Sequence, residues 1–193
     1  MNYMLLIIFH LFFHPPDARV AERWVIEKSS IFTIEGKSNV SDFKCQTSQY
    51  LNKDTIIIFS DSDPTVPLTF EGGLNVMIKW FNCEQQLMTK EMYRTLKEKE
   101  KPEMKINLVN VGRFTKSGQK VLGLVDVNMA GVTKRFEILF LVQMPDRDHI
   151  TFTGIRQLSF SDFKLKPPVK LAGLVKVEED ILVKFKISLR VAG

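Results

Sequence analysis

The sequence has few of the residues from which catalytic and metal sites are usually built. Only 3 of its 193 residues are histidines, and only 2 are cysteines. His10 and His14 lie near the N-terminus, and His149 follows Asp148 in a turn-like stretch where a surface position is expected. The sequence therefore has too few histidines and cysteines for a histidine-rich metal site or for a catalytic Ser-His or Cys-His pair. We predict no catalytic residue, no metal site and no resident cofactor, and hence a protein that is not an enzyme.

The sequence also lacks clusters of charge of one sign. The net charge is +5, but lysines and arginines are spread along the chain and are often interleaved with acidic residues. No basic cluster with interleaved aromatic residues is present, so we expect no nucleic-acid partner. Asp61 and Asp63 lie in a Ser/Pro turn, where carboxylates are expected to form the turn rather than to bind a cation. Weak attraction to an anionic membrane surface is left open.

One long apolar run is present, at the N-terminus. Met4 to Phe13 is too short to span a bilayer, has the length of a signal-peptide core, and is followed by Pro15-Pro16. We therefore expect residues 1–21 to be a signal peptide and residues 22–193 to be the mature domain, periplasmic or secreted. The alternative is a buried N-terminal strand or helix. No other stretch resembles a transmembrane segment, so none is expected in the mature chain.

The two cysteines fit the same compartment. Cys45 and Cys83 each lie at the end of an apolar, strand-like run, and their spacing is unlike that of any metal site. In an oxidising compartment we expect them to form a disulfide. Two buried free thiols are the alternative, which a cytoplasmic location would give.

Hydrophobic periodicity indicates an all-β fold. From Val121 to Val142 apolar residues alternate with others on both sides of Ala130-Gly131, which predicts a β-hairpin. Glycine at position 131 allows the positive φ that such a reversal needs. The apolar face of this hairpin must be covered, which a barrel or a sandwich would do. Further strands are expected at Ile31 to Phe43, Thr55 to Phe59, Leu74 to Phe81, Met104 to Val111 and His149 to Leu158, with a closing hairpin of Ala172 to Val177 and Ile181 to Val191 around Glu178-Glu179-Asp180.

One predicted helix interrupts the strands. Between Leu87 and Lys101, Met88, Met92 and Leu96 recur at a spacing of four, which places them on one helix face. Thr89 is expected to cap the N-terminus of this helix. The three apolar residues would either cover the barrel wall or, because methionine adapts to irregular apolar ligands, line the mouth of a cavity.

Four local features, taken in order, resemble the YceI-like family of bacterial secreted or periplasmic proteins. Together they span the chain from about Trp24 to the C-terminus. They are Pro102-Glu103-Met104-Lys105-Ile106 after the helix, Gly131-Val132-Thr133-Lys134 after the strand Val125 to Met129, Ser161-Asp162-Phe163 with its following prolines, and the closing amphipathic strand.

The resemblance implies a single antiparallel, lipocalin-like β-barrel of about eight strands with one short helix. It also implies an elongated apolar cavity that holds an isoprenoid, a fatty-acyl chain or a similar lipid. An eight-stranded barrel is about wide enough for one slender ligand. From the alternation of the strands and the spacing of Met88 and Met92 on the helix, we expect the cavity to be lined by Val76, Ile78, Met88, Met92, Ile106, Val125, Val127, Phe136, Ile138, Phe185 and Ile187.

The leading hypothesis is therefore non-enzymatic binding, sequestration or transport of a lipid. Its alternative is an envelope or stress-related protein-interaction module whose barrel is filled by its own side chains. That alternative predicts an exposed apolar patch near the helix or the Ser159 to Pro168 turn. An enzyme acting on a lipid-like substrate would need converging polar groups inside the barrel. The expected partner is a hydrophobic small molecule, and a homodimer is left open.

Overall fold

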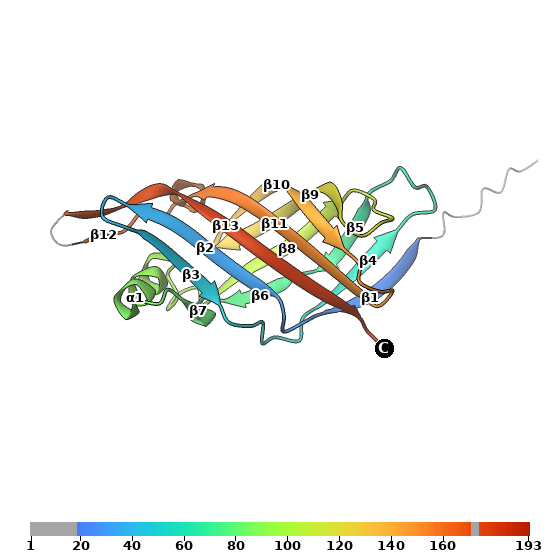
Figure 1. The fold of residues 1–193 in the computed structure, drawn as a ribbon, viewed down its shortest axis with the longest axis horizontal. Helices are drawn as coiled ribbons and strands as arrows, with labels where there is room; N and C mark the ends of the chain where they lie inside the picture. Colours follow the sequence, from blue (N-terminus) through green and yellow to red (C-terminus); the bar gives the residue numbers. More distant parts are fainter. Residues whose placement is uncertain (1–18, 171–173) are drawn as a thin grey trace, which may run out of the picture.

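Eight antiparallel strands close into a ring in the computed structural model, which describes residues 19–170 and 174–193. Each strand pairs with the next, and the last pairs with the first (Figure 1). This confirms the predicted single antiparallel, lipocalin-like barrel with one short helix. In spatial order the ring is β1 (Val20–Ile26), β4 (Thr55–Ser60), β5 (Leu68–Gly72), β8 (Glu103–Val111), β9 (Gln119–Met129), β10 (Val132–Gln143), β11 (His149–Ser159) and β13 (Val175–Val191).

The other elements lie mostly at the end of the barrel away from the C-terminus (Figure 1). Beyond β13 the sheet continues through β2, β3 and β7, whereas β6 pairs with β8 and β12 pairs with β13. Their bounds are β2 (Ile31–Ser38), β3 (Asp42–Thr47), β6 (Leu74–Met77), η1 (Ile78–Trp80), β7 (Phe81–Asn82), α1 (Gln86–Thr95), η2 (Phe160–Phe163) and β12 (Val169–Lys170).

The β9–β10 hairpin has the geometry that its sequence predicts. Val132 pairs with Met129, so Ala130 and Gly131 form a two-residue turn. Both have positive φ, 52° and 83°, which matches the twist of the flanking strands. Val125 and Val127 are buried on the inner face. Alternation therefore identified both the turn and the face that meets the core.

The strand predicted from Ile31 to Phe43 is two strands, so that prediction was wrong. The chain reverses after Ser38, whose hydroxyl donates to the carbonyl of Ser41 and accepts from the backbone N–H groups of Val40 and Ser41. A serine that satisfies backbone groups in this way stabilises a turn in place of a ladder. β2 and β3 then pair with each other, with Gly36 opposite Phe43.

The closing hairpin was also predicted wrongly, because Val175–Val191 is one continuous strand. Glu178-Glu179-Asp180 is not a turn, and the register against β2 shifts between Val177 and Ile181. The shift leaves carboxylates free to accept hydrogen bonds from the turn after β11: Glu179 from the Ser161 N–H at 2.7 Å, and Asp180 from the Ser159 hydroxyl at 2.5 Å. Ala172, the predicted start of the hairpin, lies outside the described residues.

Two further predictions differ in extent. The strand predicted from Leu74 to Phe81 is interrupted by η1, where the Ile78 N–H donates to the carbonyl of Pro102 at 2.9 Å. Before η1 the chain pairs with β8, and after it the chain pairs with β3. Helix α1 ends at Thr95, and Thr89 is not its cap. The Thr89 hydroxyl instead accepts a hydrogen bond from the Cys83 N–H and donates one to the Gln85 carbonyl.

The predicted signal peptide falls mostly outside the described residues and stays a prediction. Of residues 1–21, the structure describes Arg19, Val20 and Ala21. Val20 and Ala21 pair with Ser60 and Phe59 of β4.

Candidate functional site

A cavity of about 50 Å3 lies inside the barrel. Strands that alternate inward and outward side chains supply its walls, so almost every lining residue is apolar. The exception is Arg156, whose guanidinium carbon lies 5.6 Å from the centroid of the Phe136 ring. The lining residues are Phe32, Ile34, Phe81, Met104, Ile106, Leu108, Val125, Val127, Met129, Phe136, Ile138, Phe140, Arg156, Leu158, Ile181, Val183, Phe185 and Ile187.

Most of the residues predicted to line a cavity face this one, although their contact with a ligand stays a prediction. They are Ile106, Val125, Val127, Phe136, Ile138, Phe185 and Ile187. Val76 and Ile78 are fully buried but lie outside it. Met88 and Met92 line a separate hollow beneath α1. Sequence reasoning missed the other eleven lining residues. Two of them, Ile34 and Val183, share the inward face of their strands and were therefore accessible to the same alternation argument.

Aromatic rings fill the barrel beyond one end of this cavity. The ring of Phe152 makes edge-on contacts with Phe70, Phe114 and Phe140 at centroid distances of 6.3, 5.8 and 5.7 Å. Of these four residues, Phe140 alone lines the cavity. Edge-to-face packing of this kind stabilises a core beyond the area that it buries. These rings therefore close the cavity on the Phe152 side.

The cavity is small for a hydrocarbon ligand. At about 50 Å3 it is well below the roughly 150 Å3 of an engineered apolar cavity that binds benzene. A longer chain would therefore require lining side chains to move. Met104 and Met129 are suited to this because methionine is unbranched and changes rotamer readily.

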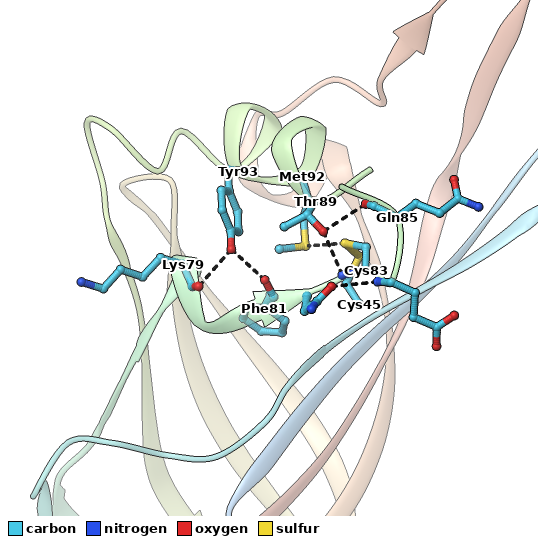
Figure 2. The surroundings of a disulfide bond; sticks show 10 residues. Cys45, Lys79, Phe81, Cys83, Gln85, Thr89, Met92 and Tyr93 are labelled. Atoms are coloured by element: carbon cyan, nitrogen blue, oxygen red, sulfur yellow. Dashed lines mark hydrogen bonds between the residues drawn. A yellow bond between two sulfur atoms is a disulfide. The ribbon is translucent and has the colours of Figure 1, made fainter. Parts of the chain in front are cut away.

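A disulfide fixes the α1 end of the barrel. Cys45 on β3 and Cys83, just before α1, are bonded, as predicted, and both are buried (Figure 2). Met92 of α1 places its sulfur 3.8 Å from that of Cys83. The Tyr93 hydroxyl lies within hydrogen-bond distance of the Phe81 carbonyl, at 2.8 Å. Burial, with a smaller contribution from nearby Glu98, raises the pKa of Tyr93. Helix, bridge and β7 thus form one packed unit.

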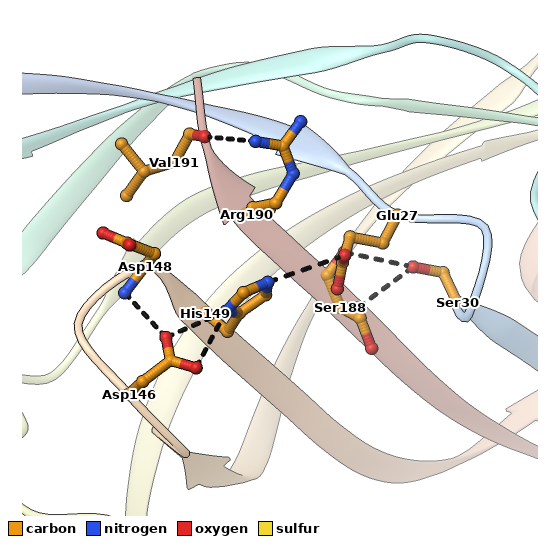
Figure 3. A network of polar contacts seen from close by, with 8 residues as sticks. All are labelled: Glu27, Ser30, Asp146, Asp148, His149, Ser188, Arg190 and Val191. Atoms are coloured by element: carbon orange, nitrogen blue, oxygen red, sulfur yellow. Dashed lines mark hydrogen bonds and ion pairs between the residues drawn. The ribbon is translucent and has the colours of Figure 1, made fainter. Parts of the chain in front are cut away.

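A polar cluster lies at the opposite end, around His149 (Figure 3). The His149 Nδ1 atom is 2.8 Å from Asp146 Oδ1, and its Nε2 atom is 3.9 Å from Glu27 Oε1. The hydrogen bond to Asp146 raises the pKa of His149, with smaller contributions from the neighbouring carboxylates. Nearby, the Ser30 hydroxyl accepts from the Ser188 N–H at 3.0 Å, which ties the β1–β2 turn to β13. Together these contacts join the β1–β2 turn, β11 and β13 at this end of the barrel.

The pKa of His149 gives a pH-dependence that can be measured. We expect NMR titration to place it above the usual value of about 6.5, and Asp146→Asn to lower it. A raised histidine pKa adds stability below the unfolded-state pKa, and that stability is lost as pH rises through the folded-state value. The melting temperature of the wild type should therefore exceed that of His149→Gln by more at acidic than at alkaline pH. An unshifted pKa, or the opposite pH trend, would contradict this assignment.

Within residues 19–170 and 174–193, no group of three or more His, Cys, Asp or Glu side chains is arranged to hold a metal ion. Among the helices described, none has both the length and the apolarity required to cross a bilayer.

Solved structures share this architecture, although no family profile and no curated protein matches the sequence. A polyisoprenoid-binding domain from Saccharophagus degradans aligns with a TM-score of 0.60 at 8% identity, over 88% of this chain and 98% of that one. Burkholderia cenocepacia BcnA aligns with a TM-score of 0.52 at 11% identity, over 82% of this chain and 95% of that one. The Campylobacter jejuni YceI protein aligns with a TM-score of 0.52 at 18% identity, over 81% of this chain and 85% of that one. The chain therefore has the fold of the YceI-like family.

Proposed function

We propose that this protein binds an isoprenoid or similar lipid chain in its barrel and sequesters or carries it without chemical change. The observation that carries the proposal is the cavity inside the barrel, whose lining is apolar except for Arg156. The polyisoprenoid-binding domain of Saccharophagus degradans has the same fold. Burying a chain of ten carbons contributes up to about 8 kcal/mol, which corresponds to micromolar affinity before ordering costs.

The same proposal places the protein outside the cytoplasm, in the periplasm or secreted. A buried Cys45–Cys83 disulfide persists in oxidising compartments. The apolar run from Met4 to Phe13, read as a signal-peptide core, leads to the same location.

A second function, a protein-interaction module with a filled barrel, is favoured by two observations. The cavity is only about 50 Å3. Large apolar side chains are also exposed near α1 and the β12–β13 connection, with Leu87 82% and Leu174 73% accessible. Exposed apolar groups of this kind can serve as contacts for a protein partner, including a second copy of this chain.

The test separates these two functions by looking for the lipid. Protein purified from its native host and extracted into organic solvent should release a stoichiometric apolar lipid in mass spectrometry. Protein stripped of lipid should melt about 5–10 °C higher with geranylgeraniol at a hundredfold excess over Kd. A short polar alcohol serves as the control and should not change the melting temperature. No extracted lipid together with no shift would reject lipid binding in favour of the filled barrel.

A further inference from the structure

Three hollows follow one another at the α1 end of the barrel. The innermost is the barrel cavity. It shares Ile34 and Ile181 with the hollow beneath α1, which measures about 30 Å3. That hollow shares Phe43, Met88 and Ile181 with an open cleft of about 720 Å3. Because adjacent hollows are bounded by the same side chains, they lie side by side, and movement of the shared side chains would open a path from solvent to the barrel interior.

The open cleft, which we call the mouth cleft, lies between the β2–β3 hairpin, the start of α1 and the irregular part of β13. It is lined by Glu35, Gly36, Lys37, Ser41, Asp42, Phe43, Lys44, Cys83, Glu84, Gln85, Met88, Gln157, Glu178, Asp180, Ile181 and Leu182. Its surface therefore mixes charged and polar groups with apolar ones, whereas the two hollows behind it are almost wholly apolar. An amphiphile with a polar head and an apolar tail matches this order.

Phe43 lies where the polar and apolar parts of the path meet. It is partly buried and packs against the core. Its ring lies directly across Gly36, so that a Cβ added to Gly36 would be 2.4 Å from the ring. Gly36 thus provides the space in which the ring lies flat against β2. Phe43 and Met88, a flexible side chain, line both the mouth cleft and the hollow beneath α1, so they lie between the two.

The charged residues of the mouth cleft are mostly acidic. Five carboxylates face two lysines: Glu35, Asp42, Glu84, Glu178 and Asp180 against Lys37 and Lys44. Glu35 pairs with Lys184 at 2.7 Å, and Asp180 accepts hydrogen bonds from Gln157 and Ser159. The remaining carboxylates, Asp42, Glu84 and Glu178, are exposed. Their negative field would repel a phosphate head and would tolerate an uncharged or cationic one.

We infer that the mouth cleft receives the polar head of the bound lipid, and that its acidic residues select chains whose head is neutral or cationic over chains that end in phosphate. This inference rests on the proposed function. It assigns the head-group specificity to Asp42, Glu84 and Glu178, and the cover of the passage to Phe43.

Two probes that differ only in the head group test the inference. Farnesol and farnesyl monophosphate carry the same tail, and calorimetry would give the Kd of each for the full-length protein. The mouth variant combines Asp42→Lys, Glu84→Lys and Glu178→Lys. The matched control combines Glu22→Lys, Glu71→Lys and Glu137→Lys, which changes net charge equally at exposed positions on β1, β5 and β10.

The wild type and the matched control should bind farnesol at least about tenfold more tightly than the phosphate, and added salt should narrow this ratio because exposed charges are screened. The mouth variant should bind the phosphate about tenfold more tightly than the wild type does. A wild type that prefers the phosphate, or a mouth variant with an unchanged ratio, would overturn the inference. A wild type that binds neither probe would instead reject the proposed function on which it rests.

The rates of lipid uptake and release test whether Phe43 covers the passage. Phe43→Ala should speed both the uptake and the release of farnesol by about tenfold in stopped-flow measurements, because the ring no longer lies across the passage. Leu87→Ala is the control, since Leu87 is exposed at the start of α1 and lines none of the three hollows. Rates that are equal in Phe43→Ala and in the wild type would remove Phe43 from the path.

Discussion

Replacing Cys45 and Cys83 together by alanine should lower the free energy of unfolding by about 4 kcal/mol. The bridge closes a loop of 38 residues, and the chain-entropy estimate for a loop of that length gives about this value. Urea denaturation of the oxidised wild type and of the double variant measures the difference. The loss of unfolding free energy should be larger if removing the buried sulfurs also leaves a cavity against Met92.

A reducing agent provides the control for this prediction. It should destabilise the wild type toward the stability of the double variant, and it should leave the double variant unchanged. Hydrogen exchange should locate the loss in α1 and β7, because the bridge ties that region to β3, whereas the β9–β10 hairpin has its own complete ladder. A double variant as stable as the oxidised wild type would show that packing alone holds α1 in place.

Much of the barrel was predictable because a strand with one buried face repeats every two residues. In β9, β10 and the second half of β13 the positions that line the cavity are all apolar, although Leu122 and Leu139 are apolar as well and face outward. The turn at Ala130-Gly131 was predictable for a local reason as well, since glycine tolerates the positive φ found there. In these segments the local preference and the tertiary contacts agree.

The errors occur where contacts distant in sequence or polar side chains decide the structure. Ser38 ends β2 by binding backbone groups of its own turn, so an apparently continuous strand divides. Glu179 and Asp180 resemble a turn in sequence, yet they accept hydrogen bonds from residues near position 160 and remain within β13. Ile78 leaves the strand because its N–H bonds to Pro102. Periodicity carries no information about such partners.

The candidate site was predictable in its lining but not in its size. Alternation gives the inward face of a strand, and this is how Val125, Ile138 and Phe185 were found. The volume depends on how rings from different strands pack, as Phe140 does against both Phe152 and Phe185. The position of α1 over the barrel end likewise depends on its disulfide and decides that Met88 and Met92 line a different hollow.

Val125→Phe should abolish lipid binding, with an affinity for geranylgeraniol at least about tenfold weaker than that of the wild type. Val125 lines the cavity and pairs with Phe136 across the β9–β10 ladder. The added ring would fill the cavity of about 50 Å3 into which the lipid chain must insert. Leu122→Phe is the matched control on the same strand, because Leu122 is 53% accessible and faces outward. It should bind like the wild type.

The stability of the lipid-free variants separates the two proposed functions independently of affinity. If the barrel is a filled core, the ring at position 125 overpacks it and costs about 1–3 kcal/mol. If the cavity and its methionines accommodate a chain, they should also accommodate the ring, and the free energy of unfolding should change by less. Binding of geranylgeraniol to Val125→Phe with unchanged affinity would exclude the barrel interior as the lipid site. A large destabilisation together with no lipid binding by the wild type would favour the filled barrel, in which the fold serves to present Leu87 and Leu174 to a partner.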